Sequence, residues 1–308
     1  MKKVIVTGPT GIIGVALIKY CIQRDIEVLA VVRPDSKNLS RLPTPSKNLE
    51  IVECDLADIA RLPSMIEGRY DVFYHLGWAA KGRLARKDAI LQSHDISFTL
   101  EAVKAAKNLG CDTFVGTGTQ KEYGKINCSI APDIPINPDT PYGVAKFAAG
   151  KLSGLLCSDL GIRHIWARLF SIYGPNDSPD SMIMYVIAKL LFAEKPSLTR
   201  CEQYWDYLYC SDAARALYLL GIYGRNNHSY NVGSGHARPL YEYVFLLRDM
   251  LDPSLPLGIG ERKYSPDQFM FLCADIDNLT RDTGFRPEIS FEEGMRRTIE
   301  WYRNLKRV

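Results

Sequence analysis

A tyrosine and a lysine four residues apart, Tyr142 and Lys146, are the residues of this sequence best suited to proton transfer. Residues i and i+4 of a helix share one face, so the lysine ammonium is expected beside the phenol. A phenol ordinarily has a pKa of about 10, and a fixed positive charge beside it favours the phenolate. The pair therefore predicts a general acid or base that exchanges a proton with a carbinol or a ketone.

The spacing Tyr-x-x-x-Lys occurs three times, and position separates the matches. They are Tyr142/Lys146, Tyr185/Lys189 and Tyr302/Lys306. Tyr142 opens a predicted helix that follows a buried strand and the segment TGTQKEYG, residues 117–124. Parallel sheets bind ligands at this carboxyl edge of their strands. Tyr185 lies in the less regular C-terminal part and Tyr302 in the last helix, so we interpret both matches as coincidence.

A glycine-rich turn near the start of the chain predicts a dinucleotide site. Its sequence, GPTGIIG, has the pattern GxxGxxG and stands between an apolar strand and a helix. Glycines allow a tight turn and a close approach of a pyrophosphate, which the positive N-terminus of the helix then stabilises. The residues of this turn expected to bind the cofactor are Gly8, Thr10, Gly11, Ile12, Ile13 and Gly14.

The end of the second strand favours NADP as that dinucleotide. An acidic residue at this place accepts a hydrogen bond from the ribose 2′-hydroxyl of NAD, whereas an arginine pairs with the 2′-phosphate of NADP. Arg33 occupies the place, and Lys37 adds positive charge close by. Asp35, two residues beyond Arg33, leaves NAD open as the alternative.

The order of the predicted elements brings these residues to one edge of a sheet. Strands are predicted at residues 4–7, 27–33, 49–53, 70–76, 113–116 and 163–168, and helices at 14–23, 91–109 and 142–160. Their alternation predicts an α/β fold, a Rossmann-type doubly wound parallel sheet covered on both faces. After residue 174 the alternation weakens, which predicts a smaller mixed α/β substrate lobe. The expected dinucleotide-binding domain comprises residues 1–174 and about 211–235, and the lobe comprises about 175–210 and 236–308.

The composition argues against several other classes of protein. The 308 residues are 46% hydrophobic, enough for a substantial core, and the net charge of +3 does not indicate a nucleic-acid-binding face. The eight cysteines form neither CxxC nor CxxH, and the five histidines have no metal spacing, so no metal site is expected. The N-terminal apolar run ends at Gly8, too short for a signal peptide or a membrane span, which predicts a cytoplasmic protein without a membrane partner.

Motifs along nearly the whole chain resemble those of the extended short-chain dehydrogenases/reductases, in particular the nucleotide-sugar epimerase/dehydratase family. They are TGPTGIIG (7–14), CDL (54–56), HLG (75–77), TGTQKEYG (117–124), YGVAK (142–146), RLFSIYGP (168–175), DYLYCSD (206–212), NVGSG (231–235) and FEEG (291–294). The wording QYWDYLY at 203–209 is similar to that of bacterial CDP- or dTDP-deoxysugar synthases. The resemblance implies an enzyme that binds NAD(P) and a nucleotide sugar.

The resemblance also implies roles for individual residues. Thr119 would be the catalytic hydroxyl that acts with Tyr142 and Lys146. The further cofactor contacts would be Asp55 and Leu56, at the adenine, together with Leu76 and Gly77. The substrate contacts would be Thr119, Gln120, Ser171, Gln203, Trp205 and Arg262, with Arg262 at the diphosphate. Two of these depart from the family pattern, since an arginine is common where Trp205 stands and an asparagine where Ser171 stands.

The segment TGTQKEYG distinguishes between the reactions of this family. Its dehydratases carry an acidic pair directly after the catalytic threonine and eliminate water across C5–C6, whereas Gln120 and Lys121 hold those places here. We therefore predict an NADP-dependent reductase of a nucleotide-diphospho-4-keto-6-deoxyhexose, in deoxysugar biosynthesis. An NAD-dependent C4 epimerase is the first alternative, and a non-catalytic NADP-binding protein the second. The helices at 91–109 and 142–160 resemble the pair that forms a dimer in this family, which implies a homodimer.

Overall fold

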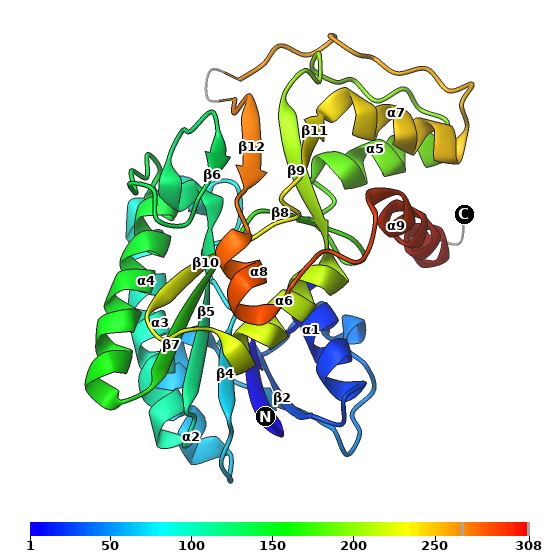
Figure 1. Ribbon diagram of the computed structural model, residues 1–308. Coiled ribbons are helices and arrows are strands. Elements are labelled where there is room, and N and C mark those ends of the chain that lie inside the picture. Colours follow the sequence, from blue (N-terminus) through cyan, green and yellow to red (C-terminus); the bar gives the residue numbers. More distant parts are fainter. Residues whose placement is uncertain (266–267, 307–308) are drawn as a thin grey trace.

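Seven parallel strands form the larger sheet of the protein, whose computed structural model describes residues 1–265 and 268–306 (Figure 1). The strands are β1 (Lys3–Thr7), β2 (Glu27–Val32), β3 (Leu49–Glu53), β4 (Val72–His75), β5 (Thr113–Thr119), β7 (Arg163–Leu169) and β10 (His228–Val232). Their order is β10-β7-β5-β4-β1-β2-β3, so the direction of winding reverses between β1 and β4. Doubly wound sheets bind ligands at the carboxyl ends of the strands beside this point. The predicted Rossmann-type fold is confirmed.

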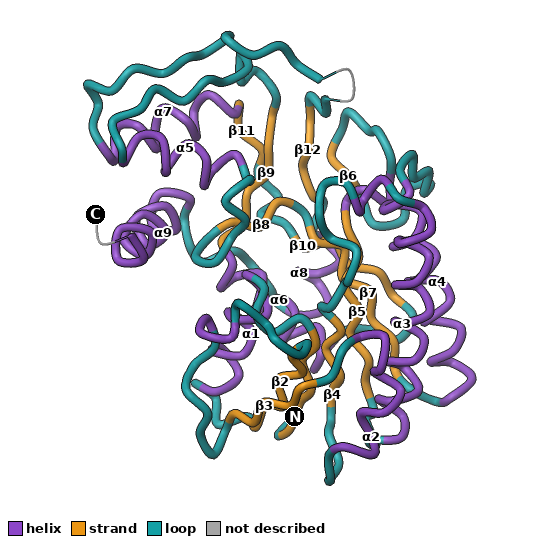
Figure 2. The backbone as a smooth tube through the Cα atoms, turned by 180° about the vertical axis from the view of Figure 1, so that it is seen from behind, coloured by secondary structure: helices purple, strands orange, loops and turns teal. Residues whose placement is uncertain are grey.

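Helices cover both faces of this sheet (Figures 1 and 2). One face carries α1 (Ile12–Ile22), α6 (Cys210–Tyr223) and α8 (Asp277–Thr283), and the other α2 (Leu62–Met65), α3 (Ala89–Asn108) and α4 (Pro141–Leu160). Within β1, Val4 and Val6 pack into the core on the first face, whereas Ile5 packs into the core on the second. Successive side chains of a strand point to opposite faces, so a strand covered on both sides needs an uninterrupted apolar run.

The second sheet and three helices build the smaller lobe, at the top of Figure 1. Its strands are β6 (Ser129–Ile130), β8 (Ser171–Tyr173), β9 (Tyr204–Tyr209), β11 (Ala237–Pro239) and β12 (Phe271–Ala274), in the order β11-β9-β12-β6 with β8 paired to β9. The helices are α5 (Met182–Leu191), α7 (Leu240–Leu251) and α9 (Phe291–Lys306). Four 3-10 turns complete the named elements: η1 (Leu39–Arg41), η2 (Leu56–Arg61), η3 (Ala85–Lys87) and η4 (Gln120–Tyr123).

Two segments belong to the opposite lobe from the one that the sequence predicts for them. Leu279 of α8 and Phe285 after it are buried in the core of the seven-stranded sheet, although residues 236–308 were expected in the substrate lobe. Conversely, β6 comes from the N-terminal range and pairs with β12 in the second sheet. The chain therefore passes between the two lobes more often than the weakening of the βα alternation indicates.

The segment TGTQKEYG continues a strand rather than forming a loop throughout. Strand β5 runs to Thr119, three residues beyond the predicted end at residue 116, and η4 follows it. Gly116 and Gly118 permit this because the ring of Trp166 lies against them, and a Cβ on either would come within 2.4 Å of the indole. The extended strand places Thr119 at the carboxyl edge of the sheet.

Within residues 1–265 and 268–306, no helix is long and apolar enough to cross a membrane. The same residues contain no group of three or more His, Cys, Asp or Glu side chains arranged to hold a metal ion.

Candidate active site

Thr119 and Tyr142 line one cleft at the carboxyl edge of the large sheet, here called the tyrosine cleft. Thr119 is the last residue of β5, and Tyr142 lies in the first turn of α4. Thr140 caps this helix, because its hydroxyl accepts a hydrogen bond from Gly143 N over 3.1 Å. Further residues that line the cleft are Ile13, Arg86, Gln120, Lys121, Ser171 and Trp205. The structure thus brings two of the three expected catalytic residues to one cleft, together with three further residues expected to bind the substrate: Gln120, Ser171 and Trp205.

The environment of Tyr142 keeps its phenol protonated at neutral pH. Burial raises the pKa of Tyr142 above its ordinary value, while the Arg86 guanidinium and a hydrogen bond with Thr119 act in the opposite direction. The Thr119 hydroxyl in turn donates to Gln120 Oε1 over 2.9 Å. A protonated phenol beside a hydroxyl is suited to donating a proton to an oxygen of a bound ligand.

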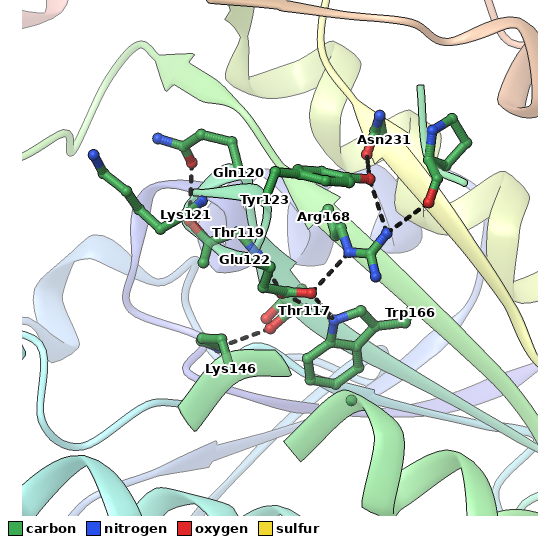
Figure 3. A network of polar contacts seen from close by, with 12 residues as sticks. Thr117, Thr119, Gln120, Lys121, Glu122, Tyr123, Lys146, Trp166, Arg168 and Asn231 are labelled. Atoms are coloured by element: carbon green, nitrogen blue, oxygen red, sulfur yellow. Dashed lines mark hydrogen bonds and ion pairs between the residues drawn. The ribbon is translucent and has the colours of Figure 1, made fainter. Parts of the chain in front are cut away.

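Lys146 lies on the same helix, and its ammonium is buried beneath the tyrosine cleft. It donates to the Thr117 carbonyl over 2.7 Å (Figure 3). It also lies 3.8 Å from the centroid of the Trp78 ring. Burial lowers the pKa of Lys146 to about 7, although Glu122 and Asp95 partly oppose this. These tertiary neighbours, in addition to the helix spacing, fix the position of the ammonium.

Glu122, the carboxylate of TGTQKEYG, is fully buried and hydrogen-bonded within the protein. It accepts hydrogen bonds from Thr119 N over 2.9 Å, Trp166 Nε1 over 3.1 Å and Arg168 Nε over 2.7 Å (Figure 3). Arg168 also donates to the Tyr123 hydroxyl over 2.8 Å. Glu122 is not among the residues expected in the site, but its spacing from Thr119 is that of a capping box, and the structure contains that box. Glu122 therefore holds Thr119 in place and points away from the tyrosine cleft.

A second cleft, the glycine-loop cleft, lies beside the turn between β1 and α1. Its lining includes six residues expected at a cofactor together with one that was missed. They are Gly8, Thr10, Arg33, Asp55, Leu56, Gly77 and the unexpected Lys81. The signal for Lys81 in the sequence is the basic stretch KGRLARK that follows β4 at residues 81–87.

The three glycines of the turn are needed for different structural reasons. Gly8 has φ +65°, and a Cβ on it would lie 2.8 Å from Gly77 N, while a Cβ on Gly14 would lie 2.4 Å from Gly8 O. These two are therefore needed for backbone packing. Gly11 has an ordinary φ of −77°, and the nearest atom to a Cβ would be 3.5 Å away. The absence of its side chain leaves space over the N-terminus of α1, where a pyrophosphate is stabilised by backbone N–H groups.

Four further residues expected to bind the cofactor have side chains that do not line the glycine-loop cleft. Lys37 is exposed and lies outside the lining of the glycine-loop cleft. Ile12 packs against the core of the smaller lobe, Ile13 lines the tyrosine cleft, and Leu76 packs against the core under α1 and α6. Asp55 lines the cleft but also caps η2, since its Oδ1 accepts from Ala57 N over 3.0 Å.

A third space, the lobe cavity, lies beside the tyrosine cleft in the smaller lobe. It has a volume of about 820 Å³, and its lining includes the expected residues Gln203, Trp205 and Arg262. Trp205 lines both spaces, which therefore adjoin each other. The Trp205 indole donates to Ser171 Oγ over 2.8 Å. The two residues that depart from the family pattern thus contact each other.

Tyr185, one of the two additional Tyr-x-x-x-Lys matches, lines the lobe cavity. Its hydroxyl accepts hydrogen bonds from Ser197 N over 3.1 Å and from Arg262 Nη2 over 3.2 Å. The arginine also stacks on its ring, with the guanidinium carbon 5.0 Å from the centroid. Tyr185 therefore orients Arg262.

The family model described as "NAD dependent epimerase/dehydratase family" matches residues 4–233. The chain belongs to this family. It is an NAD(P)-dependent enzyme of the extended short-chain dehydrogenase/reductase type. The matched residues contain the glycine turn, Thr119, Tyr142 and Lys146, and they end just after β10.

Members of the family with different activities are similar to this chain. The dTDP-glucose 4,6-dehydratase of Escherichia coli is 26% identical, over 97% of this chain and 92% of its own. The solved UDP-N-acetylglucosamine 4-epimerase of Methanobrevibacter ruminantium M1, in complex with UDP-N-acetylmuramic acid, superposes with a TM-score of 0.89 at 24% identity, covering 99% of each chain. The dTDP-glucose 4,6-dehydratase of Bacillus anthracis str. Ames, in complex with NAD, has a TM-score of 0.86 at 19% identity, covering 100% of this chain and 98% of that one.

Proposed function

We propose that this protein is an NADP-dependent reductase of a nucleotide-diphospho-4-keto-6-deoxyhexose. The observation that supports a reductase is the set of side chains after Thr119. Gln120 and Lys121 line the tyrosine cleft where the family's dehydratases carry an acidic pair, and Glu122 is buried against Arg168. Elimination of water needs a base for the C5 proton and an acid for the leaving C6 hydroxyl. Reduction of a ketone needs a single proton donor, which Tyr142 provides.

In this mechanism the bound dinucleotide supplies the hydride that reaches C4. The Tyr142 phenol, protonated at neutral pH, donates its proton to the C4 oxygen as the C–O double bond becomes a single bond. The Thr119 hydroxyl, held by the capping box with Glu122, turns its single proton from Gln120 Oε1 to the same oxygen. Lys146 provides positive charge beneath the cleft when the phenolate forms. The product is the corresponding alcohol.

Positively charged side chains line the glycine-loop cleft, and this supports NADP as the cofactor. Arg33 and Lys81 both line the cleft. Arg41 lies beside it and donates a hydrogen bond to the carbonyl of Thr10, one of the lining residues, over 3.4 Å. Loss of hydration lowers the pKa of Lys81, and repulsion from Arg33 and Arg41 lowers it further. A 2′-phosphate in this cleft would relieve that repulsion, since it carries negative charge and accepts hydrogen bonds from arginine.

Arg33→Asp is expected to weaken NADPH relative to NADH by roughly 1.5–3 kcal/mol, about 10- to 150-fold, because the substitution replaces a charged hydrogen bond to the 2′-phosphate with repulsion. The measurement is the ratio of dissociation constants for NADPH and NADH, by fluorescence titration at fixed ionic strength. Lys37→Asp is the matched control, and it should change the ratio less since Lys37 lies outside the cleft lining. A wild-type protein without NADPH preference would contradict the assignment.

The function is tested by two incubations of the pure protein. With dTDP- and CDP-4-keto-6-deoxyglucose, the protein should oxidise added NADPH. With NAD⁺ and dTDP-, CDP-, GDP- or UDP-hexoses, it should form no product with the absorbance of a 4-keto-6-deoxy sugar in base. Formation of that product would identify a dehydratase with a different acid–base pair. Tightly bound NAD together with interconversion of C4 epimers, without NADPH consumption, would identify an epimerase.

A homodimer is part of the proposal. Helices α3 and α4 pack against each other and carry exposed apolar side chains, among them Ile90 and Leu91 on α3 and Leu152 and Leu155 on α4. Exposed apolar side chains on neighbouring helices favour association with a second copy.

A further inference from the structure

The segment between β4 and α3, residues 76–88, brings positive charge to all three spaces of the site. Lys81 lines the glycine-loop cleft, Arg83 lines the lobe cavity, and Arg86 in η3 lines the tyrosine cleft. One short segment therefore contacts the places where cofactor, nucleotide sugar and proton donor are expected to meet.

Two buried polar side chains of α3 hold this segment in place. Gln92 Nε2 donates to the carbonyl of Ala80 over 2.7 Å and to that of Ala85 over 2.9 Å. Asp95 accepts hydrogen bonds from two successive N–H groups of the segment, over 2.6 and 2.9 Å. Gln92 and Asp95 are only 1% and 2% exposed, so water competes little for these bonds. Arg86, which follows the anchored Ala85, is thereby presented to the tyrosine cleft from a fixed backbone.

The guanidinium carbon of Arg86 lies 4.8 Å from the centroid of the Tyr142 ring. We propose that Arg86 is a positioning residue that stabilises the phenolate form of Tyr142 and so adjusts the proton transfer of this enzyme. The inference rests on Tyr142 as the proton donor of the proposed function. An opposite charge within about 4–6 Å of a titrating group favours its charged form, and guanidinium also binds the face of an aromatic ring.

The charged groups around Tyr142 act on its pKa in opposite directions. Glu122 from η4 and Asp95 from α3 both raise the pKa of Tyr142, and Arg86 lowers it. Lys146, from the same helix as Tyr142, adds positive charge beneath the cleft, although burial lowers its pKa to about 7. An arginine, by contrast, stays charged throughout the pH range in which a phenol titrates.

The direction of the pH effect follows from these charges. Without Arg86 the pKa of Tyr142 rises, so the phenolate forms only at higher pH. Reduction uses the protonated phenol, and the loss of activity at high pH should therefore move to still higher pH. Oxidation of the alcohol uses the phenolate, and its rate at neutral pH should fall by roughly 3- to 10-fold, the effect of a charge partly screened by solvent.

The titration of Tyr142 can be followed without any sugar substrate. Protein labelled with 13C at tyrosine Cζ is titrated with saturating NADP⁺ and, separately, with NAD⁺, and the Tyr142 resonance is assigned by its absence from Tyr142→Phe. We expect Arg86→Gln to move the Tyr142 midpoint to higher pH and Arg86→Lys to move it less. Lys87→Gln removes a charge from the same 3-10 turn and should leave the midpoint unchanged. Added salt should reduce the difference between wild type and Arg86→Gln.

Equal Tyr142 behaviour in wild type and Arg86→Gln, including absence of titration in both, would overturn the inference. So would an equal shift in Lys87→Gln, because the effect would then be one of net charge alone. Since no sugar is present, these outcomes do not depend on whether the protein reduces a 4-keto sugar. A failed reductase assay with a normal Arg86 effect would contradict the proposed substrate and leave the role of Arg86 intact.

Discussion

Tyr142→Phe should lower the turnover number by on the order of 10²–10⁴, the range for removal of a general acid. The substitution removes the phenol proton and retains the ring, so the edge contact with Trp78, at 6.1 Å between centroids, can persist. The dissociation constants of the dinucleotide and of the nucleotide sugar should change little. The measurement is single-turnover oxidation of NADPH, which separates the chemical step from product release.

Tyr302→Phe is the control for this prediction. Tyr302 has the same Tyr-x-x-x-Lys spacing but lies in α9, where it packs against the core of the smaller lobe. Its substitution should leave the chemical step nearly unchanged. Tyr185→Phe should also spare the chemical step, but it is expected to raise KM since Tyr185 orients Arg262 in the lobe cavity. A large loss of turnover in well-folded Tyr302→Phe would contradict the assignment of Tyr142.

Arg168→Met should lower the free energy of unfolding by about 3–5 kcal/mol, the usual cost of leaving one partner of a buried ion pair without the other. Glu122 is fully buried, and Arg168 Nε donates to it over 2.7 Å. The variant also loses the bonds from Arg168 to the Tyr123 hydroxyl and the Pro132 carbonyl. Denaturant unfolding followed by circular dichroism measures the change, provided that wild type and variant have the same slope.

An exposed pair provides the comparison for this prediction. Arg296 pairs with Glu293 on the surface of α9, and Arg296→Met should change the free energy of unfolding little because solvent screens the pair. Adding Glu122→Gln to Arg168→Met should recover part of the lost stability, since the unpaired charge is then gone. A loss no larger in Arg168→Met than in Arg296→Met would show that the buried network matters little for folding.

Local patterns in the sequence determined the architecture and much of the site. The run of apolar residues in β1 predicts a strand covered on both faces, and the glycines after it predict the turn, because both depend on a few adjacent residues. Thr119 and Tyr142 could be expected near each other since TGTQKEYG follows a predicted strand and Tyr142 begins the next predicted helix, both at the carboxyl edge of the sheet. The spacing of Tyr142 and Lys146 predicts a shared helix face for the same kind of reason.

The tertiary structure alone decided which groups surround these residues. Arg168 is 46 residues from Glu122 in the chain, and Trp205 is 34 residues from Ser171, yet both pairs are hydrogen-bonded. Neither these contacts nor the approach of Arg86 to Tyr142 follows from periodicity, because periodicity describes the face of an element and not what packs on it. The sequence does not predict the protonation state of Lys146 either. Burial lowers its pKa to about 7, and burial depends on the neighbours that folding brings together.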